Sequence, residues 1–382
     1  MTIVIVGAGL GGLRTAQELR KQGYDGGLVL VGDEPHLPYD RPPLSKEVIR
    51  GEREDTTFES EEYFAENRIE LRLGVAAVRV DTENTTLELA DGSTLPYDQL
   101  VIATGLRPRR VPSLPDLHGV HVLRSRDDAE SLRRDASAAA RAVVVGAGFV
   151  GCEVAAGLRH LGVDVTLVEP QATPLASVLG SEVGELVSRL HRDEGVTVRT
   201  GVGVDTLRGT DRVTHVVLSD GTEVEADLVV IGIGSTPVVE VLEASGVTVD
   251  NGIVADAYGR TDVLGVWAVG DVAAWDHPQH GRRRVEHWSN VGDQVRVMVP
   301  ALLGKEPAAA PRPVVPYFWS DQYDVKIQAL GSPSADDSVE IVEDDGRKFL
   351  AYYVRDGILT AVVGAGMAGA VMKMRAKIGQ PT

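Results

Sequence analysis

The 382-residue sequence predicts an α/β protein with two Rossmann-like domains and a small α+β domain at the C-terminal end. A glycine-rich turn, Gly7-Ala8-Gly9-Leu10-Gly11-Gly12, follows the first apolar run, and a similar turn begins 139 residues later, counting from Gly7 to Gly146. Each turn is followed by a helix-like segment and a second apolar run. The last part of the chain instead shows short strand-like segments and a cluster of aromatic residues.

The first glycine turn lies in a complete strand–turn–helix–strand unit. The apolar runs are 3–6 and 28–31, the helix is expected over 13–21, and the acids Asp33 and Glu34 follow. Glycines let backbone N–H groups approach a pyrophosphate, the helix N-terminus favours negative charge, and an acid after the second strand can accept ribose hydroxyls. We therefore predict a dinucleotide site, with a purely structural turn as the alternative. The predicted binding residues are Gly7, Gly9, Leu10, Gly11, Asp33 and Glu34.

The segment after Glu34 contains four prolines, which should prevent a helix before Leu44. Arg41 and Lys46 on this stiff segment could reach a cofactor bound at the turn, but a proline-stiffened surface loop explains the same residue types. A buried strand over 100–102 then runs into Ala103, Thr104 and Gly105. Small residues at a strand end suit close approach of a ligand to the backbone.

The second glycine turn brings its own helix, over 152–161, and its own strand, over 165–168, which ends at Glu169. A carboxylate there accepts hydrogen bonds from a ribose diol and repels a 2′-phosphate. No Arg or Lys follows before Arg189, so the sequence predicts that NADH is preferred over NADPH. The glycines of this turn, Gly146 and Gly148, should contact the cofactor together with Glu169.

Three later motifs are less specific. Gly270 and Asp271 end a strand, where Asp271 could cap a helix or bind sugar hydroxyls. His277 and His280 are separated by Pro278 and have no further ligand nearby, so we expect a solvated loop and no metal site. The third glycine motif, 364–369, lacks a following strand and acid, and we expect an ordinary strand-to-helix turn.

Composition limits the function classes. The net charge of −18 argues against a nucleic-acid or anionic-membrane binder, and the single cysteine, Cys152, allows no intrachain disulfide. No signal peptide or membrane span is expected, and a cytoplasmic location fits. The expected domains are 1–110 with 236–306, then 111–235, then 307–382, with linkers near 107–115 and 307–316.

Taken in order, these motifs resemble those of the FAD-dependent, NADH-dependent ferredoxin reductases that serve oxygenases. The specific ones are YDRPPLSK at 39–46, GAGFVGCE at 146–153, AVGDVA at 268–273, RVEHWSN at 284–290 and FWSDQYD at 318–324. The resemblance implies a glutathione-reductase-like architecture. Two departures stand out, namely Cys152 where a leucine is common and the glycine-rich segment after Val363.

The resemblance also implies the roles of particular residues. The first unit would bind one non-covalent FAD and the second would bind NADH. Lys46 would lie near flavin N5, Glu153 would pair with it, and Trp319 would close the flavin site, so these three are the expected catalytic residues. Further expected contacts to FAD are Arg41, Ala77, Arg124, Gly270, Asp271, Glu286, His287 and Trp288, and further expected contacts to NADH are Phe149, Val150, Gly232 and Ile233.

The implied activity passes electrons from NADH through FAD, one at a time, to a small [2Fe–2S] ferredoxin or a rubredoxin. That partner would supply a cytochrome P450 or a Rieske-type oxygenase, and the reductase itself would be a monomer or weak dimer. Arginines at 107, 109, 110 and 282–284 could dock an acidic ferredoxin or could be solvated loop residues. The alternatives are reduction of a small acceptor (oxygen, a quinone, monodehydroascorbate) and an interaction flavoprotein of the apoptosis-inducing-factor type.

Overall fold

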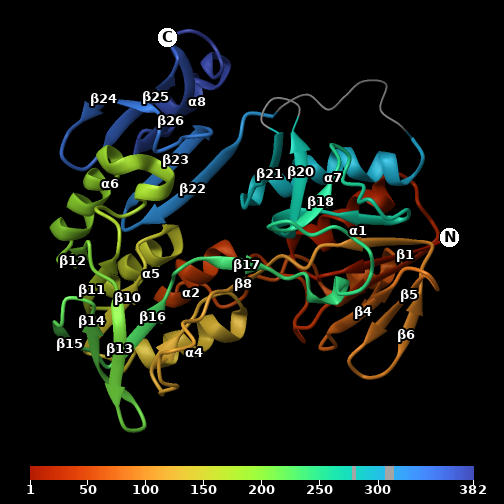
Figure 1. The fold of residues 1–382 in the computed structure, drawn as a ribbon, viewed down its shortest axis with the longest axis horizontal. Coiled ribbons are helices and arrows are strands. Elements are labelled where there is room, and N and C mark those ends of the chain that lie inside the picture. The colour runs from red at the N-terminus through yellow and green to blue at the C-terminus, as the bar shows by residue number, and fades with distance from the viewer. Residues whose placement is uncertain (278–280, 306–313) are drawn as a thin grey trace. The chain divides into compact units, whose positions relative to one another are not determined.

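The computed structural model describes residues 1–277, 281–305 and 314–382. These residues form two compact units, each assembled from separate stretches of the chain (Figure 1). Unit 1 contains Met1–Asp40, Thr56–Arg107 and Thr236–Val314, and unit 2 contains Arg41–Asp55, Pro108–Ser235 and Val315–Thr382. Two of the boundaries fall within the short strands β8 (Leu106–Pro108) and β17 (Ser235–Pro237).

Unit 1 is organised around a parallel sheet in the order β19-β7-β1-β2-β3. Its strands are β1 (Thr2–Val6), β2 (Gly27–Val31), β3 (Glu70–Arg72), β7 (Gln99–Ile102) and β19 (Val266–Ala268). The central strand β1 is an uninterrupted apolar run because both of its faces are covered. One face packs on the helices α1 (Leu10–Lys21) and α7 (Trp288–Leu302) through Leu13, Leu19 and Met298.

Smaller elements surround that sheet. One antiparallel sheet contains β4 (Ala77–Asp81), β5 (Thr86–Leu89) and β6 (Thr94–Pro96), and a second contains β18 (Ile253–Ala255), β20 (Ala273–His277) and β21 (Gly281–Arg284). The remaining elements of unit 1 are α3 (Glu61–Glu66), η2 (Glu240–Leu242) and η3 (Gly270–Val272).

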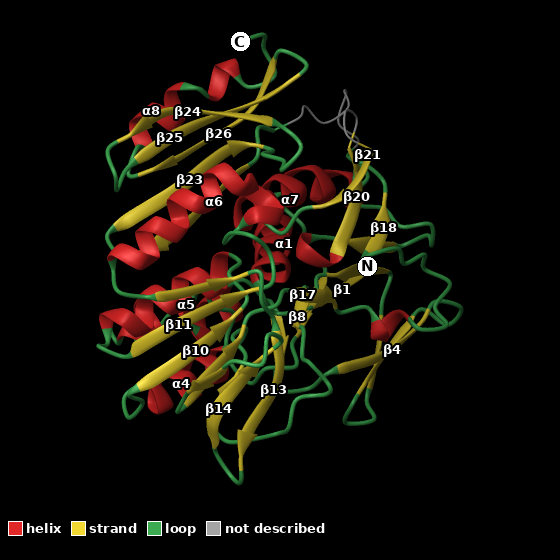
Figure 2. Cartoon of the chain, turned by 60° about the vertical axis from the view of Figure 1, so that its left-hand side comes forward, coloured by secondary structure: helices red, strands yellow, loops and turns green. Residues whose placement is uncertain are grey.

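Unit 2 repeats the parallel arrangement, in the order β12-β11-β10-β16-β9. Its strands are β9 (Val120–His121), β10 (Arg141–Val145), β11 (Asp164–Glu169), β12 (Thr197–Thr200) and β16 (Leu228–Ile231). Figure 2 shows α5 (Phe149–His160) beside β10 and β11. The other elements of this part are η1 (Pro42–Ser45), α2 (Glu47–Arg50), α4 (Arg126–Ala136), α6 (Ala176–Asp193), β13 (Val204–Gly209), β14 (Val213–Leu218) and β15 (Glu223–Glu225).

The C-terminal part of unit 2 is an antiparallel sheet in the order β22-β23-β26-β25-β24. Its strands are β22 (Tyr317–Gln322), β23 (Val325–Gly331), β24 (Ser338–Asp344), β25 (Phe349–Arg355) and β26 (Ile358–Ala365), followed by α8 (Ala368–Lys373) and η4 (Arg375–Lys377). One hydrophobic core joins this sheet to α5 and α6, and the buried Tyr353 hydroxyl donates to the Leu179 carbonyl at 2.6 Å. The aromatic cluster of the sequence is therefore a strand that packs on the second Rossmann-like part.

The observed helices and strands test several predictions made from the sequence. The third glycine motif is a strand-to-helix turn between β26 and α8, as predicted. Asp271 lies inside the 3-10 turn η3 and caps no α-helix, because α7 begins later, after His287. Residues 41–55 belong to unit 2, and the division into three domains stays a prediction. Pro278 and His280, and most of the expected linker at 307–316, lie outside the described residues.

None of the described helices combines the length and the apolar character that a membrane crossing requires.

The start of α4 offers a test of local stability. The Ser125 hydroxyl accepts from the Asp128 N–H at 3.1 Å, and the Asp128 carboxylate accepts from the Ser125 N–H at 2.9 Å. We predict that Ser125→Ala lowers the free energy of unfolding of unit 2 by about 1 kcal/mol, because it leaves a helix-end donor unpaired. Urea unfolding followed by circular dichroism measures this loss. Ser125→Asn, which can still accept that bond, should retain most of the stability.

Candidate functional site

The two glycine turns have the same backbone geometry. Gly7 and Gly146 have φ angles of +113° and +94°, which side chains rarely adopt. A Cβ on Gly7 would lie 2.2 Å from the Ala103 carbonyl oxygen, and a Cβ on Gly146 would lie 2.4 Å from that of Gly232. Only glycine fits either position, and Ala103 and Gly232 are equivalent residues of the two units.

Each turn holds its helix against the preceding strand and leaves the helix N-terminus open. A Cβ on Gly12 or Gly151 would lie 2.0 Å from the carbonyl oxygen of Gly7 or Gly146. In contrast, the space around a Cβ on Gly9 or Gly148 is free of described atoms to 4 Å. Unpaired N–H groups beside open space suit a pyrophosphate, so both turns fit a dinucleotide. The half-exposed Val150 lies at the open end of α5, next to Phe149, and Leu10 begins α1.

The acids that follow the second strands differ between the units. Gly7 N–H bonds to the Val31 carbonyl and Gly146 N–H to the Val168 carbonyl, each at 2.8 Å, which makes Gly32 the equivalent of Glu169. Glu169 accepts from the Ala147 N–H at 2.8 Å and from the Gln171 N–H at 2.9 Å. The second acid therefore lies against its own glycine turn.

In unit 1 the acids come later in the chain. Asp33 is exposed, and Glu34 accepts a hydrogen bond from the Tyr39 hydroxyl at 2.5 Å. Either carboxylate can still accept from a ribose, because each oxygen has more than one lone pair.

Other predicted cofactor residues of unit 1 are distributed over the ends of its central strands. After β7, the Thr104 hydroxyl donates to the Val238 carbonyl at 2.6 Å, and Gly105 has a φ of +70°. After β19, the Gly270 N–H donates to the Gln294 side chain at 2.8 Å, which ties η3 to α7. Ala77 lies in β4, opposite Leu89.

The N-terminus of α7 carries the remaining unit 1 residues. His287 is the N-cap, and burial lowers the pKa of its imidazole, opposed by the charge of Glu286. The Trp288 indole is 38% exposed and donates to Asp40 at 2.9 Å. A large aromatic side chain with an open face beside a helix N-terminus can lie along a planar ligand.

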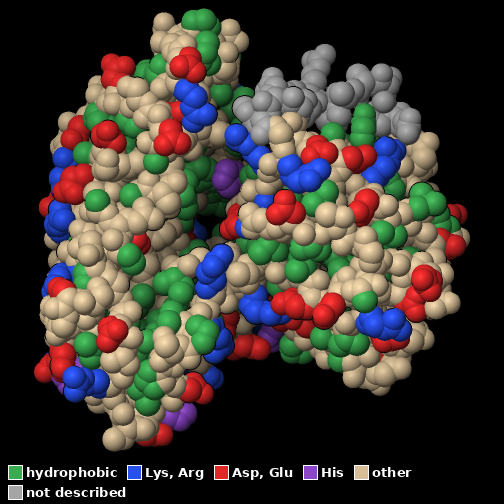
Figure 3. Space-filling model, viewed as in Figure 1, with side chains coloured by type: hydrophobic (Ala, Val, Ile, Leu, Met, Phe, Trp, Pro, Cys, Tyr) green, Lys and Arg blue, Asp and Glu red, His purple; other side chains and the backbone are tan. Residues whose placement is uncertain are grey.

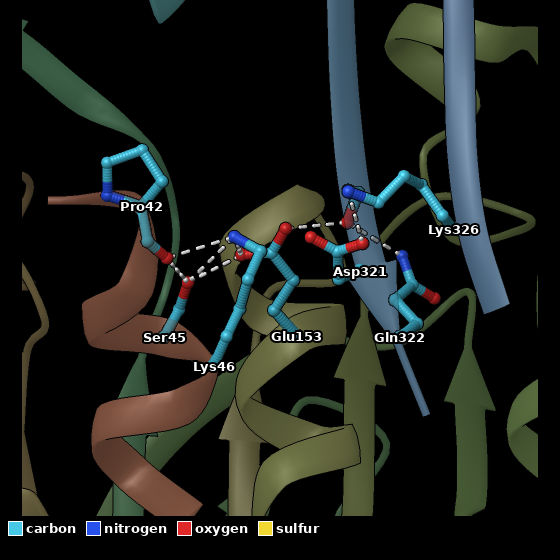
Figure 4. Close-up of polar contacts among 8 residues, drawn as sticks. Pro42, Ser45, Lys46, Glu153, Asp321, Gln322 and Lys326 are labelled. Carbon is cyan, nitrogen blue, oxygen red and sulfur yellow. Dashed lines mark hydrogen bonds and ion pairs between the residues drawn. The ribbon is translucent and has the colours of Figure 1, made fainter. Parts of the chain in front are cut away.

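Unit 2 contains a buried ion pair between two residues that are far apart in sequence (Figure 4). Lys46 Nζ lies 2.8 Å from Glu153 Oε2, and each residue is 5% exposed. Lys46 also donates to the Pro42 carbonyl at 3.0 Å, and the Ser45 hydroxyl donates to the same Glu153 oxygen at 2.5 Å. The prolines around η1 thus present a carbonyl and a lysine to α5.

The second carboxylate oxygen of Glu153 faces β22. Ser320 Oγ donates to Glu153 Oε1 at 2.7 Å, and Gln322 Nε2 donates to Ser320 Oγ at 3.2 Å. Alternation along β22 places Phe318 on the same face, where its ring lies 5.0 Å from that of Phe149. Both oxygens of the buried carboxylate therefore receive hydrogen bonds, which a buried charge requires.

Trp319 projects from the opposite face of β22. Its ring stacks on Tyr317, with 6.0 Å between centroids, and Lys326 Nζ lies 5.9 Å from it. Arg41, also in unit 2, donates to the Arg124 carbonyl at 2.7 Å. The structure thus brings Lys46 and Glu153 together, and it brings Arg41 next to Arg124.

Sequence reasoning missed Ser45, Ser320 and Gln322 as neighbours of Glu153. The period-two alternation of the aromatic segment was the available signal, since it places Phe318, Ser320 and Gln322 on one face. Which face meets Glu153 depends on the packing of β22 on α5, and that is tertiary information.

The arginines considered for docking mostly have partners in their own unit. Arg107 pairs with Glu240, Arg282 with Asp276 and Arg284 with Glu286. On the face drawn in Figure 3, acidic and basic side chains of the described residues are interspersed. Within the described part of the chain, no three His, Cys, Asp or Glu side chains are grouped to hold a metal ion.

Comparison with known proteins gives consistent matches. Residues 1–294 match the pyridine nucleotide-disulphide oxidoreductase family, and residues 317–382 match the reductase C-terminal family. Rhodocoxin reductase of Rhodococcus erythropolis is 41% identical, over 88% of this chain and 80% of that protein. The ferredoxin reductase component of chlorobenzene dioxygenase from a Cupriavidus species is 37% identical, over 98% of this chain and 93% of that protein.

The fold has close structural relatives as well. A crystal structure of the covalent putidaredoxin reductase–putidaredoxin complex superimposes with a TM-score of 0.94 at 33% identity, covering 99% of this chain and 93% of that one.

The contrast between Gly148 and Gly151 gives a matched pair of variants. We predict that Gly151→Ala destabilises unit 2 strongly, because its methyl group would overlap the Gly146 carbonyl, whereas Gly148→Ala leaves the unfolding transition nearly unchanged. Thermal unfolding of the two proteins measures this difference. Gly148→Ala should nevertheless weaken dinucleotide binding about tenfold or more, measured by calorimetry, since its methyl group enters the open space at the helix end. Equal thermal stability of the two variants would contradict this reading of the turn.

Proposed function

Because the chain belongs to the pyridine nucleotide-disulphide oxidoreductase family, as one of its ferredoxin reductases, we propose that it passes electrons from NADH through bound FAD, one at a time, to a [2Fe–2S] ferredoxin. That ferredoxin in turn supplies an oxygenase. The observation that carries the proposal is the buried Lys46–Glu153 pair, which lies in a chain that also has two dinucleotide-type turns.

The two turns suggest which residues hold which cofactor. Gly7, Gly9, Leu10 and Gly11 would hold the FAD pyrophosphate, with Asp33 or Glu34 at the ribose. Gly146, Gly148, Phe149 and Val150 would hold NADH, with Glu169 at its ribose. The remaining FAD contacts would come from Arg41, Ala77, Ala103, Thr104, Gly105, Arg124, Gly270, Asp271, Glu286, His287, Trp288 and Trp319, and the remaining NADH contacts from Glu153, Gly232 and Ile233.

FAD supplies the chemistry that the chain itself lacks, because it takes up an electron pair from NADH and releases the electrons singly. The ammonium group of Lys46 is held in one position, since it donates hydrogen bonds to the Pro42 carbonyl and to Glu153. We propose that it places this charge and a hydrogen-bond donor at the reactive edge of the flavin ring. Glu153 holds Lys46 in place, so the two act by position and electrostatics.

A dithiol acceptor within the chain does not fit. Cys152 is the only cysteine, it is fully buried, and burial raises the pKa of its thiol, with smaller contributions from Glu153 and Glu169. The segment 41–46, close to Glu153, contains no cysteine. An external one-electron acceptor therefore fits this chain better than an internal disulfide does.

Preference for NADH is supported by the surroundings of Glu169. The neighbouring strand β12 carries a cation at Arg199, which lies opposite Val168 in register. Its guanidinium is held by Asp220 at 3.0 Å, and Thr222 lies within 3.4 Å. A 2′-phosphate at the ribose would thus meet the Glu169 carboxylate, while this arginine is already paired.

Removing the lysine tests the role of the ion pair. We predict that Lys46→Ala slows reduction of the flavin by NADH by about a hundredfold, because the variant loses a positioned charge and leaves Glu153 buried without a counter-ion. Stopped-flow absorbance of the bound flavin measures the rate. Lys21→Ala, which removes an exposed lysine of α1, is the control and should match the parent protein. A normal rate in Lys46→Ala would reject this role.

Glu169 provides a test of cofactor choice. We predict that Glu169→Ala lowers the ratio of kcat/KM for NADH to kcat/KM for NADPH by about tenfold. The variant loses both the repulsion of a 2′-phosphate and the hydrogen bonds to the ribose of NADH. Steady-state kinetics with both nucleotides gives the ratio. An unchanged ratio would place the discrimination elsewhere.

The acceptor is identified by comparing NADH oxidation with and without added [2Fe–2S] ferredoxin, using cytochrome c as the final electron acceptor. Turnover that depends on the ferredoxin supports the proposal. Fast NADH oxidation by oxygen or a quinone alone would favour a small acceptor. A slow, long-lived NADH–flavin charge-transfer state would favour an interaction protein.

A further inference from the structure

The carboxylate of Glu153 lies at one end of a buried row of polar side chains in unit 2. Ser320, Gln322 and His191 have no exposed surface, and they come from β22 and α6. Figure 4 shows the side chains of Lys46, Glu153 and Gln322 in this region, with dashed lines for their hydrogen bonds and ion pair. Burial of this many polar groups costs free energy unless they bond to one another, so their order matters.

The hydrogen bonds of this row all donate in one direction. Glu153 Oε1 can only accept from Ser320 Oγ, so the Ser320 hydroxyl uses its proton there and accepts from Gln322 Nε2. The amide nitrogen of Gln322 thus faces Ser320, and its carbonyl oxygen Oε1 is left as an acceptor. Within the described residues, Gln322 Oε1 and His191 Nε2 are both buried atoms without a partner of good geometry.

His191 lies beside this row, but within the described residues no hydrogen bond of good geometry joins it to Gln322. Burial lowers the pKa of its imidazole to about 4, and the Gln322 side chain has a smaller, opposite effect. Burial therefore favours the neutral form of the imidazole near pH 7. Its Nδ1 lies 2.7 Å from the Tyr323 hydroxyl oxygen, and the tautomer of the ring decides which of the two donates. Tyr323 is partly exposed at the end of β22, near Arg159, Glu194 and Arg347.

We propose that Ser320 and Gln322 are positioning residues, which direct two hydrogen-bond donors in series at Glu153 and thereby fix the orientation of its carboxylate against Lys46. This inference rests on the proposed role of the Lys46–Glu153 pair. Hydrogen bonds in series polarise one another, so each donor strengthens the next. A path that conducts protons fits less well, because an amide such as Gln322 donates and accepts but does not pass a proton on.

None of the charged or thiol groups next to this row takes the place of the Ser320 hydroxyl as the donor to Glu153 Oε1. Lys46 is the cation that faces Glu153, and it bonds to the other carboxylate oxygen. Cys152, the neighbour of Glu153 on α5, directs its sulfur at the Ala147 carbonyl. Asp321 projects from the other face of β22 and pairs with Lys326 at 3.2 Å. Glu153 Oε1 therefore depends on the Ser320 hydroxyl.

The chain offers a matched control for removing that hydroxyl. Ser188 is buried as completely as Ser320, but its hydroxyl has no partner in the described structure. Ser320→Ala and Ser188→Ala therefore delete the same atom at the same burial, and only the first deletes a donor to Glu153. Ser320→Thr restores the hydroxyl, and Gln322→Met removes the second donor while keeping the length of the side chain.

Infrared spectra of the purified full-length protein test the proposal. The carboxylate stretching band of Glu153 is isolated by subtracting the spectrum of Glu153→Gln. We expect this band to move in Ser320→Ala, to move less in Gln322→Met, and to keep its position in Ser188→Ala and Ser320→Thr. Flavin reduction by NADH should slow about tenfold in Ser320→Ala with an unchanged dissociation constant for NADH, since a hydrogen bond to a charged group is lost.

Two results would overturn the proposal. An unmoved band in Ser320→Ala shows that the hydroxyl does not bond to Glu153. Equal shifts in Ser320→Ala and Ser188→Ala show a packing effect only. If Ser320→Ala does not fold, Gln322→Met supplies the same comparison. The infrared measurement needs neither NADH nor a ferredoxin, so it remains decisive for Glu153 even where the ferredoxin assay fails.

Discussion

The buried pair of Lys46 and Glu153 is the interaction on which the candidate site depends. Either charge alone would be costly in this interior, so each fixes the position of the other. The pair and the residues that bond to it come from three separate stretches of the chain. Pro42 and Ser45 come from η1, Glu153 itself from α5, and Ser320 from β22. The ion pair therefore requires the proline-rich segment, the second glycine-turn helix and the C-terminal sheet to pack together within unit 2.

The glycine turns show how one backbone geometry serves two ligands. Gly7 and Gly146 meet the same obstacle, a carbonyl oxygen at the end of the neighbouring strand, and Gly12 and Gly151 meet the carbonyl of the turn itself. These constraints select for a phosphate at the helix end but not for a particular nucleotide. The two units differ at the end of the second strand, where Gly32 in unit 1 is the equivalent of Glu169 in unit 2.

The sequence was sufficient to predict elements whose signal is local. The apolar strands of both Rossmann-like parts, both glycine turns and the strands of the C-terminal sheet follow from periodicity and turn residues. The predicted starts of two helices, at residues 13 and 152, are too late in the chain, since α1 begins at Leu10 and α5 at Phe149. Tight packing on the strand outweighs the low helix propensity of the glycines there. The helix α6 is kinked at Gly180, where the backbone is not helical.

Residues whose role depends on packing were not predictable in the same way. Lys46 and Glu153 were paired through resemblance to a family, since nothing local connects positions 107 residues apart. Ser45, Ser320 and Gln322 carry no spacing signal of their own, because serine and glutamine occur throughout polar segments. Glu169 was predicted to accept hydrogen bonds from a ribose, and that stays a prediction. The structure adds that it accepts from the backbone N–H groups of Ala147, in its glycine turn, and of Gln171.

The helix α5 explains why this site favours electron transfer to an outside acceptor. Cys152 and Glu153 are adjacent, so their side chains leave the helix in different directions: the carboxylate toward Lys46 and β22, the sulfur toward the Ala147 carbonyl. A thiolate at Cys152 would lie in an apolar interior near two carboxylates, and its pKa is raised accordingly. The same helix thus provides the carboxylate that positions Lys46, and it holds the one thiol of the chain where a thiolate is disfavoured. Electrons that reach this site have no covalent acceptor among its side chains, and their acceptor has to come from another molecule.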